Sequence, residues 1–121
     1  MKMNPKLIFG SPPGDGSLDE QRRDWLDVVA RELKIKHSVW DVISHQVDDF
    51  NLVPFPAARQ FFYDGGTWGK PLRRRFAHPL TWGEIWKACD TLIGKAGDLD
   101  HRFIEIVECQ TDGTITFFCG S

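Results

Sequence analysis

Residues 102–119 have the sequence RFIEIVECQTDGTITFFC, in which the pair Asp112-Gly113 separates two runs rich in β-branched and aromatic side chains. An Asp-Gly pair in this setting is a strong signal for a β-hairpin with a two-residue turn. The stretch therefore predicts two antiparallel strands, Arg102–Cys109 and Thr114–Cys119.

A two-residue turn would fix the register between these strands. It would place Cys109 opposite Thr116 and Cys119 opposite Ile106, so that the two thiols point to opposite faces and form no disulfide. Both faces of the hairpin are then apolar: one carries Ile104, Ile106, Ile115 and Phe117, and the other carries Phe103, Val107 and Phe118.

An isolated hairpin is only marginally stable in water, so further strands or helices must cover it. The runs Leu7–Phe9 and Gln60–Tyr63 are the available extra strands. We therefore expect an α+β fold: about three helices packed on a small, mostly antiparallel sheet that includes the C-terminal hairpin. Residues 1–121 would form one small domain, in which residues 1–16 supply a short strand and a turn-rich loop.

Three stretches carry helix signals. Capping boxes, in which a hydroxyl and a Glu three residues later satisfy each other's backbone amides, occur at Ser17–Glu20 and Thr81–Glu84. Ser38, with Asp41 three residues later, predicts the start of another helix, although Val39–Ile43 alone is also compatible with a strand. Residues at helical spacing follow each start: Trp25, Leu26, Val29, Ala30 and Leu33; Val39, Trp40, Ile43, Val47 and Phe50; and Trp82, Ile85, Trp86, Cys89, Leu92 and Ile93, ending at Gly94 or Gly97.

The composition is that of an ordinary globular protein. The chain has 121 residues, 41% of them hydrophobic, and 15 Lys+Arg against 17 Asp+Glu give a formal net charge of -2. This excludes a two-domain enzyme, a coiled coil and a disordered tail, and it gives no overall attraction to nucleic acid or anionic membrane. Three cysteines without a CxxC pair suit a reducing compartment, and no signal peptide or membrane span is evident. We expect a soluble cytoplasmic protein.

The segment 51–78 differs from the rest of the chain, because it is long, partly irregular, aromatic and basic. Long irregular segments in small domains are usually functional or disordered, and the aromatic residues argue against disorder. Trp68 lies among glycines, with no periodic reason to be buried. Trp and Arg are enriched where proteins bind one another. The candidate binding residues are Trp68, Lys70, Arg73, Arg74, Arg75, Phe76 and His78.

The leading hypothesis is a non-enzymatic module that binds another protein, or a second copy of itself, through the 64–78 loop. The C-terminal hairpin would offer a strand edge for such pairing. The alternative is binding of single-stranded nucleic acid or a phosphorylated ligand through Lys70 and Arg73–Arg75, with nearby aromatic rings stacking on bases.

Other chemistry has weaker support. Asp98, Asp100 and His101 could ligate a metal, but such clusters more often form turns. The cysteines fall within predicted core elements, which does not suit a nucleophile. A small enzyme using His78 or His101 as an acid or base ranks third. We expect no catalytic residue, no cofactor and no bound metal.

Overall fold

The computed structural model describes residues 19–41, 47 and 49–120. Within this part lie two helices, α2 (Asp19–Leu33) and α3 (Trp82–Ala96), and five strands, β1 (Val39–Trp40), β2 (Gln60–Tyr63), β3 (Leu72–Arg75), β4 (Phe103–Cys109) and β5 (Thr114–Gly120). The predicted strand at residues 7–9 and the predicted N-cap Ser17 lie outside the described residues. No helix of the described part is long and apolar enough to cross a bilayer.

The strands form one mixed sheet in the order β1-β4-β5-β2-β3. The pairs β2–β3 and β4–β5 are antiparallel, whereas β1–β4 and β2–β5 are parallel. The predicted α+β class is therefore confirmed. The prediction of three helices on a mostly antiparallel sheet is wrong, because the described part has two helices and a mixed sheet. Both hairpin strands lie inside the sheet, but β1 pairs only with Phe103 and Ile104 of β4, so the rest of that edge, from Glu105 to Cys109, pairs with no other strand of the described part.

Helix α3 agrees with the sequence analysis. The Thr81 hydroxyl accepts from the Glu84 amide at 3.2 Å, and the Glu84 carboxylate accepts from the Thr81 amide at 2.9 Å. The helix ends at Gly97, whose φ of 95° is the left-handed conformation that glycine adopts easily. Local chemistry at both ends therefore fixes this helix.

The helix start predicted at Ser38 is wrong, because the backbone there joins the sheet; residues 42–46 and 48 of that predicted helix lie outside the described residues. Val39 and Trp40 pair with Phe103 and Ile104 as strand β1. Ser38 does not cap a helix: its hydroxyl donates to Asp90 at 2.8 Å and accepts from the Trp86 indole at 3.1 Å. Burial of Trp40 against the aromatic rings Phe50, Trp82 and Trp86 accompanies the extended conformation.

The C-terminal hairpin forms, but its register differs from the predicted one. Gly113 has φ 85° and its amide donates to the Gln110 carbonyl at 3.0 Å, so the loop has three residues and not two. Cys109 consequently pairs with Ile115, and a further register shift in β4 brings Cys119 opposite Ile104. Both thiols face the helix side of the sheet, at opposite ends of the hairpin, and both are free.

A register shift between Ile104 and Ile106 changes which hairpin side chains face the core. Such a bulge inserts an extra residue and reverses the alternation beyond it. Ile104 and Val107 are both fully buried, whereas Ile106 is 47% exposed. The predicted face assignments of Ile106 and Val107 are therefore wrong.

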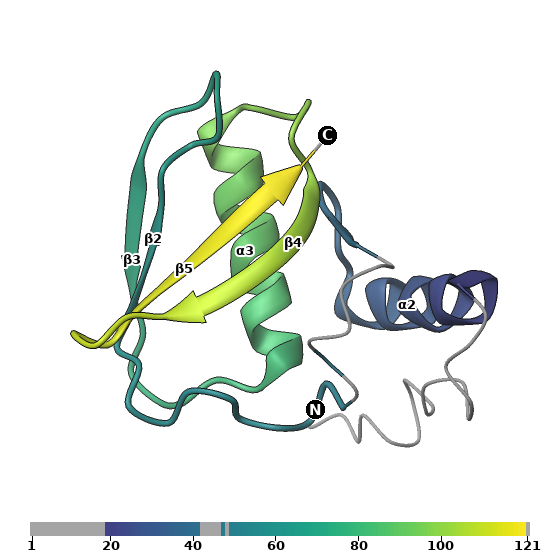
Figure 1. The fold of residues 1–121 in the computed structure, drawn as a ribbon, viewed down its shortest axis with the longest axis horizontal. Coiled ribbons are helices and arrows are strands. Elements are labelled where there is room, and N and C mark those ends of the chain that lie inside the picture. The colour runs from purple at the N-terminus through teal and green to yellow at the C-terminus, as the bar shows by residue number, and fades with distance from the viewer. Residues whose placement is uncertain (1–18, 42–46, 48, 121) are drawn as a thin grey trace.

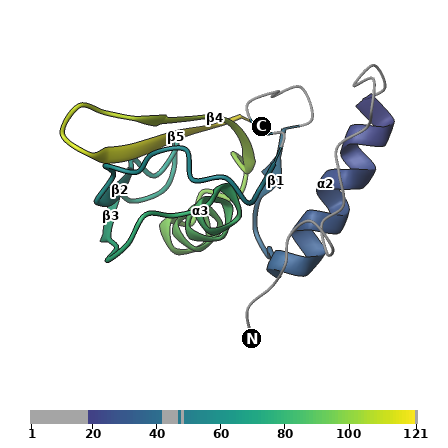
Figure 2. The same ribbon diagram turned by 90° about the horizontal axis from the view of Figure 1, so that it is seen from below.

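Helix α3 packs on one face of the sheet, and α2 lies beside the β1 edge (Figures 1 and 2). The core between α3 and the sheet is aromatic, and Tyr63 stacks on Phe117 at a centroid distance of 4.5 Å. Trp25 and Val29 of α2 extend this core at its side.

Candidate functional site

The predicted contact segment 64–78 is a hairpin arm rather than one loop. Its residues 72–75 form the edge strand β3, paired with β2. Trp68 lies in the turn at one end of this strand, whereas Phe76 and His78 follow its other end. The predicted site residues therefore lie in three places: the turn that contains Trp68, called the tip; strand β3; and the residues that follow β3.

The tip presents an exposed tryptophan on an anchored backbone. The Trp68 side chain is 76% exposed, the largest value among the exposed apolar residues of the described part. Its amide and that of Thr67 donate to Asp98 Oδ2 at 3.0 and 2.8 Å. Gly66 has φ 67°, and a Cβ there would lie 2.6 Å from the same carboxylate oxygen. The turn therefore needs glycine where the backbone meets Asp98.

From the sequence, Asp98 is a candidate metal ligand or a turn residue, and in the structure it accepts hydrogen bonds from backbone amides of turns. It is 2% exposed, and besides the two tip amides it accepts from the Asp100 amide and from His101 Nδ1 at 2.8 Å. Burial raises its pKa, but the hydrogen bonds from Trp68, His101 and Thr67 outweigh that effect and hold the pKa below its usual value. The carboxylate is thus a clamp for the tip. No group of three metal-ligating side chains occurs among the described residues.

The arginines of β3 point alternately to the two faces of the sheet. Arg74 pairs with the buried Phe61 and shares its helix-facing side, whereas Arg73 lies over the Phe62 ring at 4.8 Å on the other side. Arg75 is exposed and, being two residues from Arg73, shares its face. The run of three arginines is therefore not one patch.

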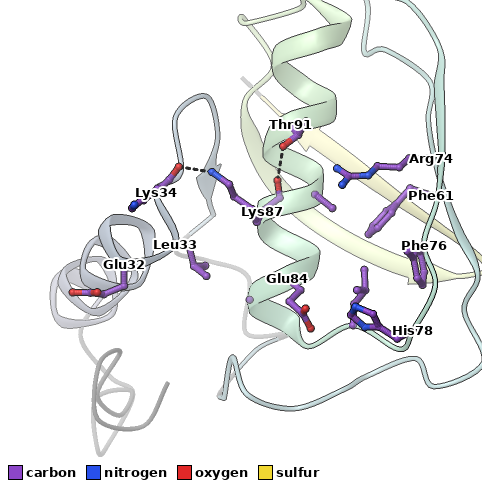
Figure 3. A pocket seen from close by; sticks show the side chains of 13 residues that line it. Glu32, Leu33, Lys34, Phe61, Arg74, Phe76, His78, Glu84, Lys87 and Thr91 are labelled. Carbon is purple, nitrogen blue, oxygen red and sulfur yellow. Dashed lines mark hydrogen bonds between the residues drawn. The ribbon is translucent and has the colours of Figure 1, made fainter. Parts of the chain in front are cut away.

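Arg74 faces a groove between the sheet and α3 (Figure 3). One cavity of about 520 Å³ is lined by apolar side chains, by the basic residues Arg74, His78 and Lys87, and by the carboxylates of Glu32 and Glu84. A second cavity of about 470 Å³ shares Arg74 and Thr91 with the first and adds Lys95. Lys87, Thr91 and Lys95 are four residues apart on α3 and so share one helix face.

The remaining predicted residues have structural contacts. The Phe76 ring packs on Phe61 at 5.3 Å, and its amide donates to the Arg59 carbonyl. The Lys70 amide donates to the Ala96 carbonyl, which joins the arm to the end of α3. The exposed His78 donates through Nδ1 to the Pro79 carbonyl at 3.0 Å.

Cys89 and Cys119 are unsuited to nucleophilic chemistry. Burial raises the pKa of the Cys119 thiol to about 12 and that of Cys89 well above its usual value. Both thiols therefore stay protonated at neutral pH, and a thiol is a far weaker nucleophile than a thiolate.

Comparison of the chain with protein-family models, with curated proteins and with solved structures finds no match.

Proposed function

We propose that the protein is a non-enzymatic interaction module that binds another protein with the tip of the β2–β3 hairpin. The observation that carries this proposal is Trp68, which is 76% exposed although its own amide is hydrogen-bonded to a buried carboxylate. An exposed tryptophan on a fixed backbone loses little conformational freedom on binding, and tryptophan is enriched among the residues that dominate binding energies.

The test compares affinity capture from lysate by the wild type, Trp68→Ala and Leu52→Ala. Leu52 is a matched control, since it is 57% exposed but lies outside the hairpin arm. We expect a stoichiometric protein that the wild type and Leu52→Ala retain and that Trp68→Ala loses. Retention of the same protein by a folded Trp68→Ala variant would contradict the proposal.

A second candidate function is binding of single-stranded nucleic acid or a phosphorylated ligand in the groove between β3 and α3. The observation that favours it is that Arg74 from β3 and Lys95 from α3 line one cavity. Lys87 does not add to this pair, because its ammonium donates to the Lys34 carbonyl at 2.7 Å, on the other side of α3 (Figure 3). No carboxylate lines the cavity that contains Lys95, as far as the described residues show. Lysines on α3 were not part of the patch predicted from the sequence, because nothing local connects them to β3.

This candidate is tested by fluorescence anisotropy with a labelled single-stranded oligothymidine at several salt concentrations. Each lost phosphate contact lowers the slope of log K against log salt by about 0.7 for a single strand. The double variant Arg74→Ala, Lys95→Ala should therefore lower the slope by about 1.4. Arg23→Ala, which removes an exposed cation on α2, should leave the slope unchanged. Equal slopes in all three proteins would exclude the groove.

A further inference from the structure

The face of the sheet opposite α3 carries a stripe of apolar side chains. None of the described elements packs over this face, which is turned toward the reader in Figure 1 and lies above α3 in Figure 2. Phe118 on β5 is 66% exposed, and its cross-strand neighbour Ile106 on β4 is 47% exposed. Phe103, one row further along β4, is 39% exposed.

The stripe runs diagonally across three strands. Phe62 on β2 pairs with Thr116, which is two residues from Phe118 on β5; Phe103 pairs with Gly120, two residues beyond Phe118. Where one face of a sheet is exposed to water, apolar and polar residues normally alternate along each strand, so that the exposed face is polar. A contiguous run of large exposed apolar groups instead marks an interaction surface.

The two ends of the stripe carry opposite charges. At the β3 end, Arg73 lies over the Phe62 ring and Arg75 follows it on the same face. At the β4 end, Glu108 pairs with Thr116, and the Glu105 carboxylate lies over Gly120, where a Cβ would come within 2.9 Å of it. All four charged side chains are exposed.

The acidic and basic ends of this face cannot pair with each other within one molecule. In the row that contains Glu108, Thr116, Phe62 and Arg73, two strands separate the acid from the base. Three strand spacings of about 4.8 Å place their backbones roughly 14 Å apart. Arg73 also has an electrostatic interaction with Asp112 in the β4–β5 loop. The acidic end of this face is nevertheless too far from the basic end to pair with it, so each end can pair with the opposite end of another molecule.

We propose that a second copy of this chain packs on the face, so that the protein forms a dimer with the two sheets face to face. A two-fold axis that crosses the stripe places the basic end of each copy over the acidic end of the other. Such an interface is isologous, because a surface that is acidic at one end and basic at the other complements itself. Phe118 and Ile106 form its apolar centre, and Arg73, Arg75, Glu105 and Glu108 form its charged rim. This interface is separate from the hairpin tip proposed above.

The test is sedimentation velocity over a range of protein concentrations, with two charge-reversed variants. One carries Glu105→Arg and Glu108→Arg, and the other carries Arg73→Glu and Arg75→Glu. In a homodimer of either variant, like charges would face each other, and we expect dimerisation to weaken about tenfold or more. An equimolar mixture of the two variants restores opposite charges and should form a heterodimer about as stable as the wild-type dimer. Failure of the mixture to associate would overturn the proposal.

Three further variants test whether dimerisation depends on this sheet face and not on another part of the surface. Phe118→Ser should be folded and monomeric, whereas Leu99→Ser, at a residue 48% exposed outside the sheet, should dimerise like the wild type. Trp68→Ala should also dimerise, because it changes only the tip. At a protein concentration of about 100 μM, a dimer with a dissociation constant of about 1 μM would be almost fully formed. A wild type that stays monomeric at this concentration would overturn the proposal. A dimer that survives Phe118→Ser would overturn it as well.

Discussion

Asp90→Asn should destabilise the protein strongly, because this carboxylate of α3 holds the chain that leads into β1. Asp90 is 2% exposed. Its Oδ1 accepts from the His37 amide at 2.7 Å and from the Ser38 amide and hydroxyl at 2.8 Å each, and its Oδ2 accepts from the Lys36 amide at 2.9 Å. Four donors thus converge on one buried side chain.

The magnitude follows from what asparagine can replace. Its carbonyl oxygen can keep the three bonds of Oδ1, but its NH₂ group would face the Lys36 amide, donor against donor. Losing one bond to a charged acceptor costs about 1.5–3 kcal/mol, and neutralising the other three weakens each of them. Removal of the buried charge offsets part of this loss. Asp90→Asn should therefore lower the free energy of unfolding by about 3 kcal/mol. For 121 residues, at about 2.1 cal/mol/K of unfolding entropy per residue, Tm should fall by about 12 °C.

The effect should depend on pH. Burial raises the pKa of Asp90, but the hydrogen bonds from Lys36, Ser38 and His37 outweigh it and hold the pKa below its usual value. A carboxyl with a depressed pKa stabilises the fold fully above the unfolded pKa of about 3.9, and loses that contribution as pH falls through the folded pKa. The difference in the free energy of unfolding between the wild type and Asp90→Asn should therefore be largest at neutral pH and decrease below about pH 4.

Urea unfolding of the wild type and Asp90→Asn at pH 7 and at about pH 3 measures this difference, and the slope m shows whether both unfold alike. Asp27→Asn is the control, because Asp27 is an exposed residue of α2 and should change stability by less than about 0.5 kcal/mol. A loss below about 1 kcal/mol in Asp90→Asn at pH 7, or an equal loss at both pH values, would refute this account of the carboxylate.

Three other substitutions test local features. Trp68→Ala should change stability by less than about 0.5 kcal/mol, but it should remove most of the acrylamide-quenchable tryptophan fluorescence, since Trp25, Trp40, Trp82 and Trp86 are each at most 7% exposed; unchanged quenching would show that Trp68 is covered. Thr81→Ala should cost about 1 kcal/mol in thermal unfolding through loss of the α3 cap, and a neutral result would contradict the capping role. Gly113→Ala should cost about 1–2 kcal/mol, because φ is 85° and the new Cβ would lie 3.2 Å from the Ala57 carbonyl oxygen; a stable variant would argue against this loop geometry.

Elements whose signals are local could be predicted from the sequence. The cap of α3 needs only Thr81 and Glu84, three residues apart, and the hairpin needs only the glycine after Asp112. The sequence did not favour strand β1 over a helix, because Val39 and Trp40 gain their hydrogen bonds from β4, far along the chain. Their apolar spacing fits a helix equally well, and tertiary pairing overrides such a local preference.

The sequence also determined which residue types could bind a partner, since an isolated Trp68 and a run of arginines are visible without a structure. Only the tertiary structure decided where these groups act. Strand pairing turns Arg73 and Arg74 to opposite faces, because side chains alternate along a strand. The buried Asp98 clamps the turn that presents Trp68, and the bulge in β4 turns Ile106 outward beside Phe118. Each of these outcomes depends on contacts between residues distant in sequence, which no local pattern records.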